Sequence, residues 1–280
     1  MGKASRDRRD IYYRLAKEEG WRARSAYKLM QIDEQFSILT DTDGNLLERI
    51  VDLCSAPGSW SQVLSKRLWE PRSIDERSRV RIVGVDLQAM APIPGVISMQ
   101  GDITSQETSR RIISQFSTGE KAQLVVCDGA PDVTGMHDLD QFVQFQLIKS
   151  ALNISKQILD IGGTFVCKVF RGRDSPLLSQ QLRPLFSGIV AIAKPRSSRN
   201  SSLEAFVVCR GFRGPCEISS LTETCGFLPF VSCGDLSGYD ADFCYPLENN
   251  YTSLPPVQPP INPPYSESCR KAKTQTLIEN

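Results

Sequence analysis

Three aspartates follow short apolar runs of strand type. Asp86 ends the run RIVGV, Asp102 comes soon after VISM, and Asp128 ends LVVC. Because the carboxyl ends of parallel strands meet at one edge of a sheet, the three carboxylates are expected to line one crevice. A carboxylate accepts two hydrogen bonds from a diol, so these acids favour a nucleoside-containing cofactor. The plainer interpretation of any single one is a helix cap or a turn.

The stretch Arg49 to Trp60, RIVDLCSAPGSW, is expected to lie at the same crevice. Ile50, Val51 and Leu53 predict a buried strand, and the following Ala-Pro-Gly predicts a tight turn into a helix. Small residues let a backbone approach a cofactor, although an ordinary strand-to-helix turn has the same pattern. With Gly58 as the one glycine of SAPGSW, a pyrophosphate-bearing dinucleotide is disfavoured, and an adenosyl cofactor without phosphates fits better.

Strands and helices alternate along the rest of the chain. Apolar runs predict strands at 81–85, 96–99, 124–127, 164–169, 189–193 and 205–209, and helical spacing predicts helices at 22–36, 103–116, 143–158 and 177–186. Gly162 and Gly163 are expected to end the long helix, and the charged segment 69–81 is expected to be an exposed loop. The alternation predicts a mainly parallel sheet with helices on both faces.

Composition narrows the class of protein. A chain of 280 residues with 23% charged and 40% apolar residues is long enough for one sizeable soluble core. No apolar segment of signal or membrane-spanning type is found, so a cytoplasmic location is expected. The nine cysteines include four in apolar, strand-like runs that are expected to be reduced, and with no close CxxC pair and one histidine, His137, no metal site is expected. The four are Cys54, Cys127, Cys167 and Cys209.

The net charge of +1 conceals a basic N-terminus. Before Lys28, basic residues outnumber acidic ones and are interleaved with tyrosines and a tryptophan. Basic side chains suit phosphate contact and aromatic rings suit base stacking, so this segment is a candidate nucleic-acid surface. A solvated charged helix is an equally common explanation. The candidate contacts are Arg8, Arg9, Arg22 and Arg24.

Six motifs in one order resemble the FtsJ/RrmJ family of S-adenosylmethionine-dependent RNA ribose 2'-O-methyltransferases: DLCSAPGSWSQ, VDLQAM, GDIT, CDGAPDVTG, FVCKVFRG and SLEAFVVC. The resemblance runs from Lys3 to Cys209 and is greater to the eukaryotic tRNA branch, which modifies anticodon-loop positions 32 and 34. It implies an α/β fold of the class I methyltransferase type, Rossmann-like, with a seven-stranded, mostly parallel sheet whose last strand, 205–209, is antiparallel, and helices on both faces. Bacterial ribosomal members more often have GAAPGGW; Cys54, Ser55 and Ser59 depart from that version but remain small.

The resemblance also implies roles for individual residues. S-adenosyl-L-methionine would be held by Gly58, Trp60, Asp86, Asp102 and Asp128, although Trp60 could equally be a simple core residue. The family's K-D-K-E catalytic tetrad would consist of Lys28, Asp128, Lys168 and Glu204.

The chemistry of ribose methylation constrains what Lys168 could do. A 2'-hydroxyl is a weak nucleophile that must be aligned for in-line displacement and must lose its proton. A lysine accepts a proton only if its charged form is disfavoured, by burial or by a nearby cation such as Lys28. Asp128 and Glu204 would instead favour the charged form, so Lys168 could be the base or an orienting group. By itself, a Lys168–Glu204 pair would indicate only a surface ion pair.

Two further basic stretches, RGRDS and KPRSSRNSS, are expected to face RNA, through Arg171, Arg173, Arg196 and Arg199. Splayed bases of an anticodon loop suit such recognition, and ribosomal RNA or an mRNA cap are alternative substrates. Two other classes stay open. A non-catalytic RNA-binding subunit is disfavoured because all four tetrad positions are present, and a nicotinamide-dependent oxidoreductase is disfavoured by SAPGSW.

The chain is expected to divide into three parts. Residues 1–36 form a basic, RNA-facing arm and helix, 37–212 the methyltransferase domain, and 213–280 an irregular extension that ends in a proline-rich segment. That segment could dock a partner or serve as a linker. The resemblance implies tRNA and auxiliary protein subunits as partners, different ones for different anticodon-loop positions and one of them a WD-repeat protein, and no membrane. The isolated chain is therefore expected to be a weak enzyme on tRNA.

Overall fold

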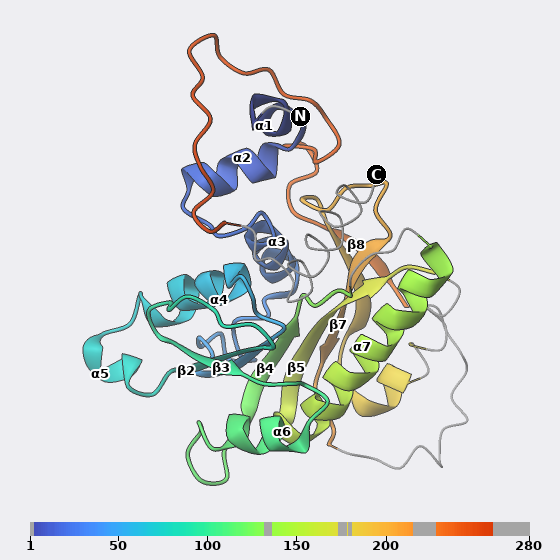
Figure 1. Cartoon of the computed structure of the whole chain (residues 1–280). Helices are drawn as coiled ribbons and strands as arrows, with labels where there is room; N and C mark the ends of the chain where they lie inside the picture. The colour runs from blue at the N-terminus through green and yellow to red at the C-terminus, as the bar shows by residue number, and fades with distance from the viewer. Residues whose placement is uncertain (1–2, 132–135, 173–177, 179–180, 215–227, 260–280) are drawn as a thin grey trace, which may run out of the picture.

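The structure is a computed structural model that describes residues 3–131, 136–172, 178, 181–214 and 228–259. Within these residues, eight strands form one sheet in the order β3-β2-β1-β4-β5-β7-β6-β8 (Figure 1). β7 is antiparallel to both neighbours, and the other pairs are parallel. The predicted mostly parallel α/β sheet with an antiparallel 205–209 strand is thus confirmed, but the sheet has one strand more than the expected seven, because β8 follows 205–209 and pairs with β6. The strands are β1 Arg49–Leu53, β2 Arg81–Asp86, β3 Val96–Gln100, β4 Ala122–Cys127, β5 Leu159–Phe170, β6 Val190–Pro195, β7 Glu204–Arg210 and β8 Phe230–Cys233.

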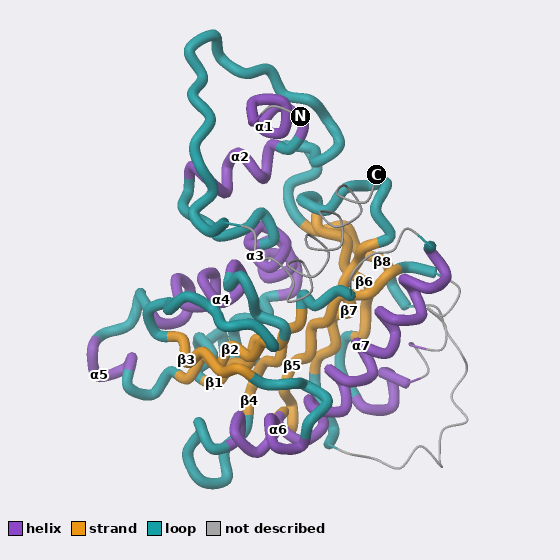
Figure 2. The backbone as a smooth tube through the Cα atoms, viewed as in Figure 1, coloured by secondary structure: helices purple, strands orange, loops and turns teal. Residues whose placement is uncertain are grey.

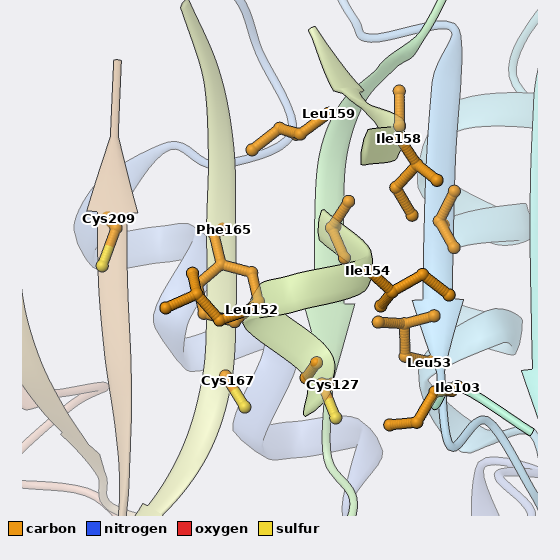
Figure 3. Packing of buried hydrophobic residues seen from close by; sticks show 14 of the residues in the cluster. Leu53, Ile103, Cys127, Leu152, Ile154, Ile158, Leu159, Phe165, Cys167 and Cys209 are labelled. Carbon is orange, nitrogen blue, oxygen red and sulfur yellow. The ribbon is translucent and has the colours of Figure 1, made fainter. Parts of the chain in front are cut away.

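Two apolar cores, one on each face of the sheet, hold the helices. Successive strand residues point to opposite faces, so Ile50 packs toward α3 and α4 while Val51 and Leu53 pack toward α6 and α7. Figure 3 shows the second core, with residues of α7 lying over Phe165 of β5 and over Leu53. The helices are α1 Lys3–Arg9, α2 Ile11–Glu18, α3 Ala26–Phe36, α4 Ser59–Leu64, α5 Ile74–Arg77, α6 Gln106–Ile113 and α7 His137–Ile158.

The segment 235–254, here called the C-terminal strap, lies against the N-terminal helices α1 and α2 (Figures 1 and 2). The buried ion pair Lys17–Asp7 (2.7 Å) joins the two parts, because Lys17 also donates to the carbonyl of Leu254 (3.0 Å) and Asp7 accepts from Tyr251 (2.9 Å). The ends of the described chain therefore hold each other.

Helix α3 and the helix after β3 are shorter than predicted. The helix expected at 22–36 starts only at Ala26, after a tighter turn in which the backbone N–H groups of Ala26 and Tyr27 donate to the carbonyls three residues earlier (3.2 and 3.3 Å). The helix expected at 103–116 is confined to α6, because Asp102 accepts the backbone N–H of Thr104 (2.8 Å) in a turn before the helix.

Three further expectations fail in part. Segment 69–81 contains α5, which begins with a capping box formed by Ser73 and Glu76. α7 ends at Ile158 and passes directly into β5, before the two glycines. β8 lies in the extension expected to be irregular, where it pairs with β6. Most of 177–181 in the last predicted helix lies outside the described residues. In the described part, no helix is long and apolar enough to cross a membrane.

Candidate active site

Four charged side chains meet where the ends of β4 and β5 and the start of β7 face α3. This ionic cluster consists of Lys28, Asp128, Lys168 and Glu204. The Nζ atom of Lys168 lies 3.0 Å from Asp128 and 3.3 Å from Glu204, and that of Lys28 lies 2.9 Å from Glu204 and 3.9 Å from Asp128. The four side chains are only 10% to 17% exposed. The structure therefore brings together all four residues that the resemblance assigned to the tetrad, with each cation beside both anions.

The charges of the ionic cluster decide which groups are ionised. Burial acts to lower the pKa of Lys168, but the charges of Asp128 and Glu204 outweigh it and raise this pKa above the ordinary lysine value. Burial acts to raise the pKa of Glu204, but Lys28 and Lys168 lower it to about 2. Lys168 is therefore an ammonium group at neutral pH in this state. It can donate hydrogen bonds to a substrate oxygen, but it cannot accept a proton.

Glu204 is held by two residues for which no supporting role was predicted. Ser198 Oγ donates to Glu204 Oε1 (2.6 Å), and Lys194 Nζ donates to the backbone carbonyls of Glu204 (2.6 Å) and Ser202 (2.9 Å). Burial, with a contribution from Arg171, lowers the pKa of Lys194 to about 8. The available sequence signal was their place in KPRSSRNSS, just before Glu204.

Ser25 connects the ionic cluster to the turn after β1. Its hydroxyl bonds to Asp128, and its backbone carbonyl accepts a hydrogen bond from Trp60 Nε1 (2.9 Å). Trp60 is buried against Phe206, with 5.5 Å between ring centroids. The structure thus places Trp60 in the core, where it fixes Ser25 from behind. Ser25 was not predicted as a site residue, although it stands three residues before Lys28 in ARSAYK.

Gly58 forms the closest approach in the turn after β1. Its φ is 106°, and a Cβ there would lie 2.7 Å from Met90 Sδ and 2.8 Å from an Arg22 guanidinium nitrogen. Arg22 donates to the carbonyl of Pro57 (3.0 Å) and to those of residues 91 and 92 (2.9 and 2.8 Å). Arg22, a candidate RNA contact in the sequence, therefore ties the turn to the segment after β2.

Asp86 and Asp102 follow the neighbouring strands. Asp86 accepts the backbone N–H groups of Ala56 (2.9 Å) and Gln88 (2.8 Å), so it touches the turn directly. Asp102 accepts the backbone N–H (2.8 Å) and the hydroxyl (2.7 Å) of Thr104, and these bonds lower its pKa. Each carboxylate retains lone pairs for a ligand, because a carboxylate has about four acceptor positions.

The polar groups beside the turn fit a nucleoside. Ser55 Oγ and Gln88 Oε1 are buried and have no hydrogen-bond partner among the described residues. Asp52, which lies within the predicted strand and was not predicted as a site residue, is fully buried. It accepts a hydrogen bond from the hydroxyl of Ser61 (2.6 Å). Burial raises the pKa of Asp52 to about 8, so it is neutral at pH 7. The crevice thus offers orphaned polar atoms and the carboxyl groups of Asp86 and Asp102, a set that suits ribose hydroxyls rather than phosphates.

The candidate RNA contacts near the ionic cluster have protein partners. Arg24 bonds to Asp10 and to the carbonyl of Ser197. Arg196 forms an ion pair with Asp240 (2.9 Å). Arg171 lies 5.3 Å from the centroid of the Phe230 ring, on β8.

The remaining candidate RNA contacts lie farther out. Arg8 and Arg9 are exposed on α1. Arg199 is 49% exposed and lies 3.7 Å from Asp10. Arg173 lies outside the described residues.

The sheet order, the turn at Gly58 and the ionic cluster define a methyltransferase of one family. The model of the FtsJ-like methyltransferases matches residues 21–212, and the chain belongs to this family.

Relatives that match nearly the whole chain are named for tRNA methylation, and relatives that match part of it are named for ribosomal RNA methylation. A mouse protein, "tRNA (cytidine(32)/guanosine(34)-2'-O)-methyltransferase", is 51% identical over 100% of this chain and 89% of its own length. Its namesake from Schizosaccharomyces pombe is 51% identical over 96% of both chains. The AdoMet-dependent rRNA methyltransferase SPB1 of Candida albicans is 43% identical over 76% of this chain, but over only 24% of its own length. A solved ribosomal RNA methyltransferase of Plasmodium falciparum has 26% identity and a TM-score of 0.58, covering 70% of this chain and 100% of its own.

Proposed function

We propose that this chain transfers a methyl group from S-adenosyl-L-methionine to ribose 2'-hydroxyls of the tRNA anticodon loop, at positions 32 and 34. The observation that carries the proposal is the ionic cluster of two lysines and two acids next to the Gly58 turn. The substrate follows from relatives named for tRNA positions 32 and 34, which are 51% identical over essentially the whole chain.

The cofactor would be held by the turn and by the acids beside it. Gly58 leaves room for close approach, Asp86 and Asp102 would accept hydrogen bonds from ribose hydroxyls, and Ser55 would gain the partner that it lacks among the described residues. When bound, S-adenosyl-L-methionine supplies an electrophilic methyl group on its sulfonium. Trp60 would support the cofactor site indirectly, because it positions Ser25. Ser25 in turn positions Asp128.

Lys168 is proposed to orient the 2'-oxygen. As an ammonium group between Asp128 and Glu204, it can donate a hydrogen bond to that oxygen and align one lone pair with the methyl group. The hydroxyl proton leaves during transfer and ends in solvent. Lys168 could take that proton itself only after RNA had separated it from the two acids that raise its pKa.

RNA binding and partners complete the proposal. The arginines of α1 and of the loop before β7 would contact RNA phosphates. The proposed parts of the chain are residues 1–36, 37–212 and 213–280, and the proposed location is the cytoplasm.

Auxiliary protein subunits, one of them a WD-repeat protein, would direct the enzyme to its nucleotides. Leu236, Tyr239 and Phe243 in the strap are exposed apolar side chains that such subunits could cover. The isolated chain is accordingly expected to methylate tRNA weakly, and full activity of the purified chain alone would refute the need for a partner.

The substrate test uses RNA from a strain that lacks this protein. The chain, co-purified with its partners, is incubated with labelled S-adenosylmethionine and with total tRNA, ribosomal RNA or capped mRNA, and modified riboses are mapped by mass spectrometry. Label at anticodon-loop riboses is expected. Label in ribosomal RNA alone would instead favour the activity named for the 43% identical relative. Cofactor binding without transfer to any RNA would favour a non-catalytic subunit.

A further inference from the structure

A cavity with several charged side chains in its lining lies outside the candidate active site. It has a volume of about 390 Å³ and is formed by three segments that are far apart in the sequence: α1, the loop before β7, and the C-terminal strap. Its lining includes three arginines, Arg6, Arg9 and Arg199, together with Ser201 and the strap residues Asp242 and Cys244. Neither the proposed cofactor residues nor the ionic cluster line it.

The walls of this cavity are fixed to one another. The backbone N–H of Tyr245 in the strap donates to the carbonyl of Arg8 in α1 (2.8 Å). The backbone N–H of Asn200 in the loop donates to Asp242 in the strap (2.7 Å). The cavity is therefore preformed, and a ligand would not have to order these segments when it binds.

The chemistry of the lining suits a phosphate group. Guanidinium groups have several donors in a planar fork that matches phosphate oxygens, and a serine hydroxyl adds another donor. The two acids in the lining already have protein partners, because Asp10 bonds to Arg24 and Asp242 to Asn200. Arg199 is half exposed and its distance of 3.7 Å from Asp10 is longer than a hydrogen bond, so it can turn toward a ligand without breaking a close contact.

The position of the cavity favours a phosphodiester of RNA over a free phosphate. Ser198 and Arg199 are consecutive residues: Ser198 donates to Glu204 of the ionic cluster (2.6 Å), while Arg199 lines the cavity. A polynucleotide with its reactive ribose at the ionic cluster would thus carry neighbouring phosphates past Arg199. An isolated phosphate would gain nothing from this proximity.

We propose that this cavity binds a backbone phosphate of the substrate RNA next to the reactive nucleotide, and that the C-terminal strap is part of the RNA-binding surface. The inference rests on the proposed function, because it takes RNA to be the substrate. It adds a discrete site to a general basic surface, and it gives the strap a role in substrate binding.

The first test measures the affinity of Arg199→Ala and Arg9→Ala for an anticodon stem-loop RNA over a range of salt concentrations. Each variant is expected to bind roughly 5- to 20-fold more weakly and to lower the salt slope by about 0.7 to 0.9, the loss expected for one phosphate contact. The matched control is Arg110→Ala, which removes an exposed arginine from α6, distant from α1 in Figure 1. Unchanged affinity and slope in both cavity variants would overturn the site.

A second test avoids the risk that an arginine variant misfolds. A stem-loop series in which single phosphates are replaced by neutral methylphosphonates is bound to the wild-type chain and to Arg199→Lys, whose folding is checked by retained cofactor affinity. Neutralising one particular phosphate is expected to weaken binding to the wild-type chain. The same replacement should weaken binding to Arg199→Lys less, because lysine cannot make the bidentate contact. Equal effects of every methylphosphonate on both proteins would contradict the site.

A third test addresses the strap. Cys244 is exposed and lines the cavity, so its reaction with N-ethylmaleimide, followed at that residue by mass spectrometry, reports on occupancy. Stem-loop RNA is expected to slow the reaction severalfold, whereas inorganic phosphate at the same concentration is not. An unchanged rate with saturating RNA would remove the strap from the RNA surface, and equal protection by phosphate would indicate a free-phosphate site. A chain that bound RNA through the cavity but transferred no methyl group would refute the proposed function and leave this site standing.

Discussion

The turn at 55–60 and the ionic cluster lie at the same edge of the sheet, but different forces hold them. The turn is fixed by backbone geometry: a glycine at φ 106°, and an arginine that donates to three carbonyls. The cluster is fixed by charge: its two lysines and two acids come from four separate segments, and each lysine lies within 3.9 Å of both acids. One region is therefore sensitive to shape, and the other to the sign of a charge. Substitutions in each should fail in different ways.

The largest effect is expected from Lys168→Ala. Removing the ammonium group that orients the 2'-oxygen should lower turnover by roughly 10²- to 10³-fold, the range for removing one hydrogen-bond donor that acts on a reacting oxygen. Cofactor and RNA affinity should change little. Single-turnover methyl transfer measures the turnover, and titration measures the two affinities. The matched control is Lys149→Ala, which removes an exposed lysine of α7. Full turnover in Lys168→Ala, with cofactor and RNA bound normally, would show that Lys168 does not orient the 2'-oxygen.

Gly58→Ala should act on the cofactor rather than on the chemical step. The added Cβ would lie 2.7 Å from Met90, and the alanine would have to adopt a left-handed φ, so the turn must move. We expect roughly 10- to 100-fold weaker binding of S-adenosylhomocysteine by calorimetry. Gly44→Ala separates the two causes, because Gly44 has a φ of 82° with nothing within 4 Å of its Cβ position. It should cost about 1 kcal/mol of stability and leave cofactor affinity unchanged.

Ser25→Ala tests whether the two regions are coupled. Asp128 would lose one hydrogen bond, while the bond from Trp60 to the carbonyl of Ser25 would remain. We expect turnover to fall about tenfold, which corresponds to one net hydrogen bond to a charged group. The fall should appear in kcat with KM unchanged, a split that a purely structural serine would not produce. Ser78→Ala, at an exposed turn, is the control, and equal behaviour of the two variants would argue against coupling.

The smallest effect on turnover is expected at Asp52, but its effect on stability should depend on pH. Its folded-state pKa of about 8 lies above the unfolded value of about 3.9, so the stability that protonated Asp52 contributes is fully present below about pH 4 and is lost as the pH rises through 8. Asp52→Asn lacks that loss and retains an acceptor for Ser61. Thermal melts from pH 4 to 8 should show a growing advantage for the variant. A constant difference over this range would mean that Asp52 ionises normally.

The turn could be predicted from the sequence because its signals are local. An apolar run, a Pro-Gly break and a helical repeat stand within one stretch, so β1, the turn and α4 could be located, as could Asp86 after β2. The start of α3 could not, since the same helical spacing continues through the tight turn that precedes Ala26. The same holds for β8, whose partner β6 lies outside its own segment.

The ionic cluster could not be predicted from local patterns. Lys28, Asp128, Lys168 and Glu204 have no common spacing, and only the family resemblance, which runs from Lys3 to Cys209, linked them. Three supporting residues were missed for the same reason. Ser25, Ser198 and Lys194 act through contacts that exist only after the sheet has closed. Lys194 in particular counts as a surface charge in the sequence but is buried in the structure.

The proposed methyl acceptor is a ribose 2'-hydroxyl placed at the ionic cluster. The most direct measurement compares methyl transfer by the partner-bound chain to an anticodon stem-loop with ordinary riboses and to one carrying 2'-deoxy sugars at positions 32 and 34. Both RNAs should bind with similar affinity, and the deoxy RNA should take up no label. Label incorporated into the deoxy RNA at the same rate would place the methyl group elsewhere and contradict the account.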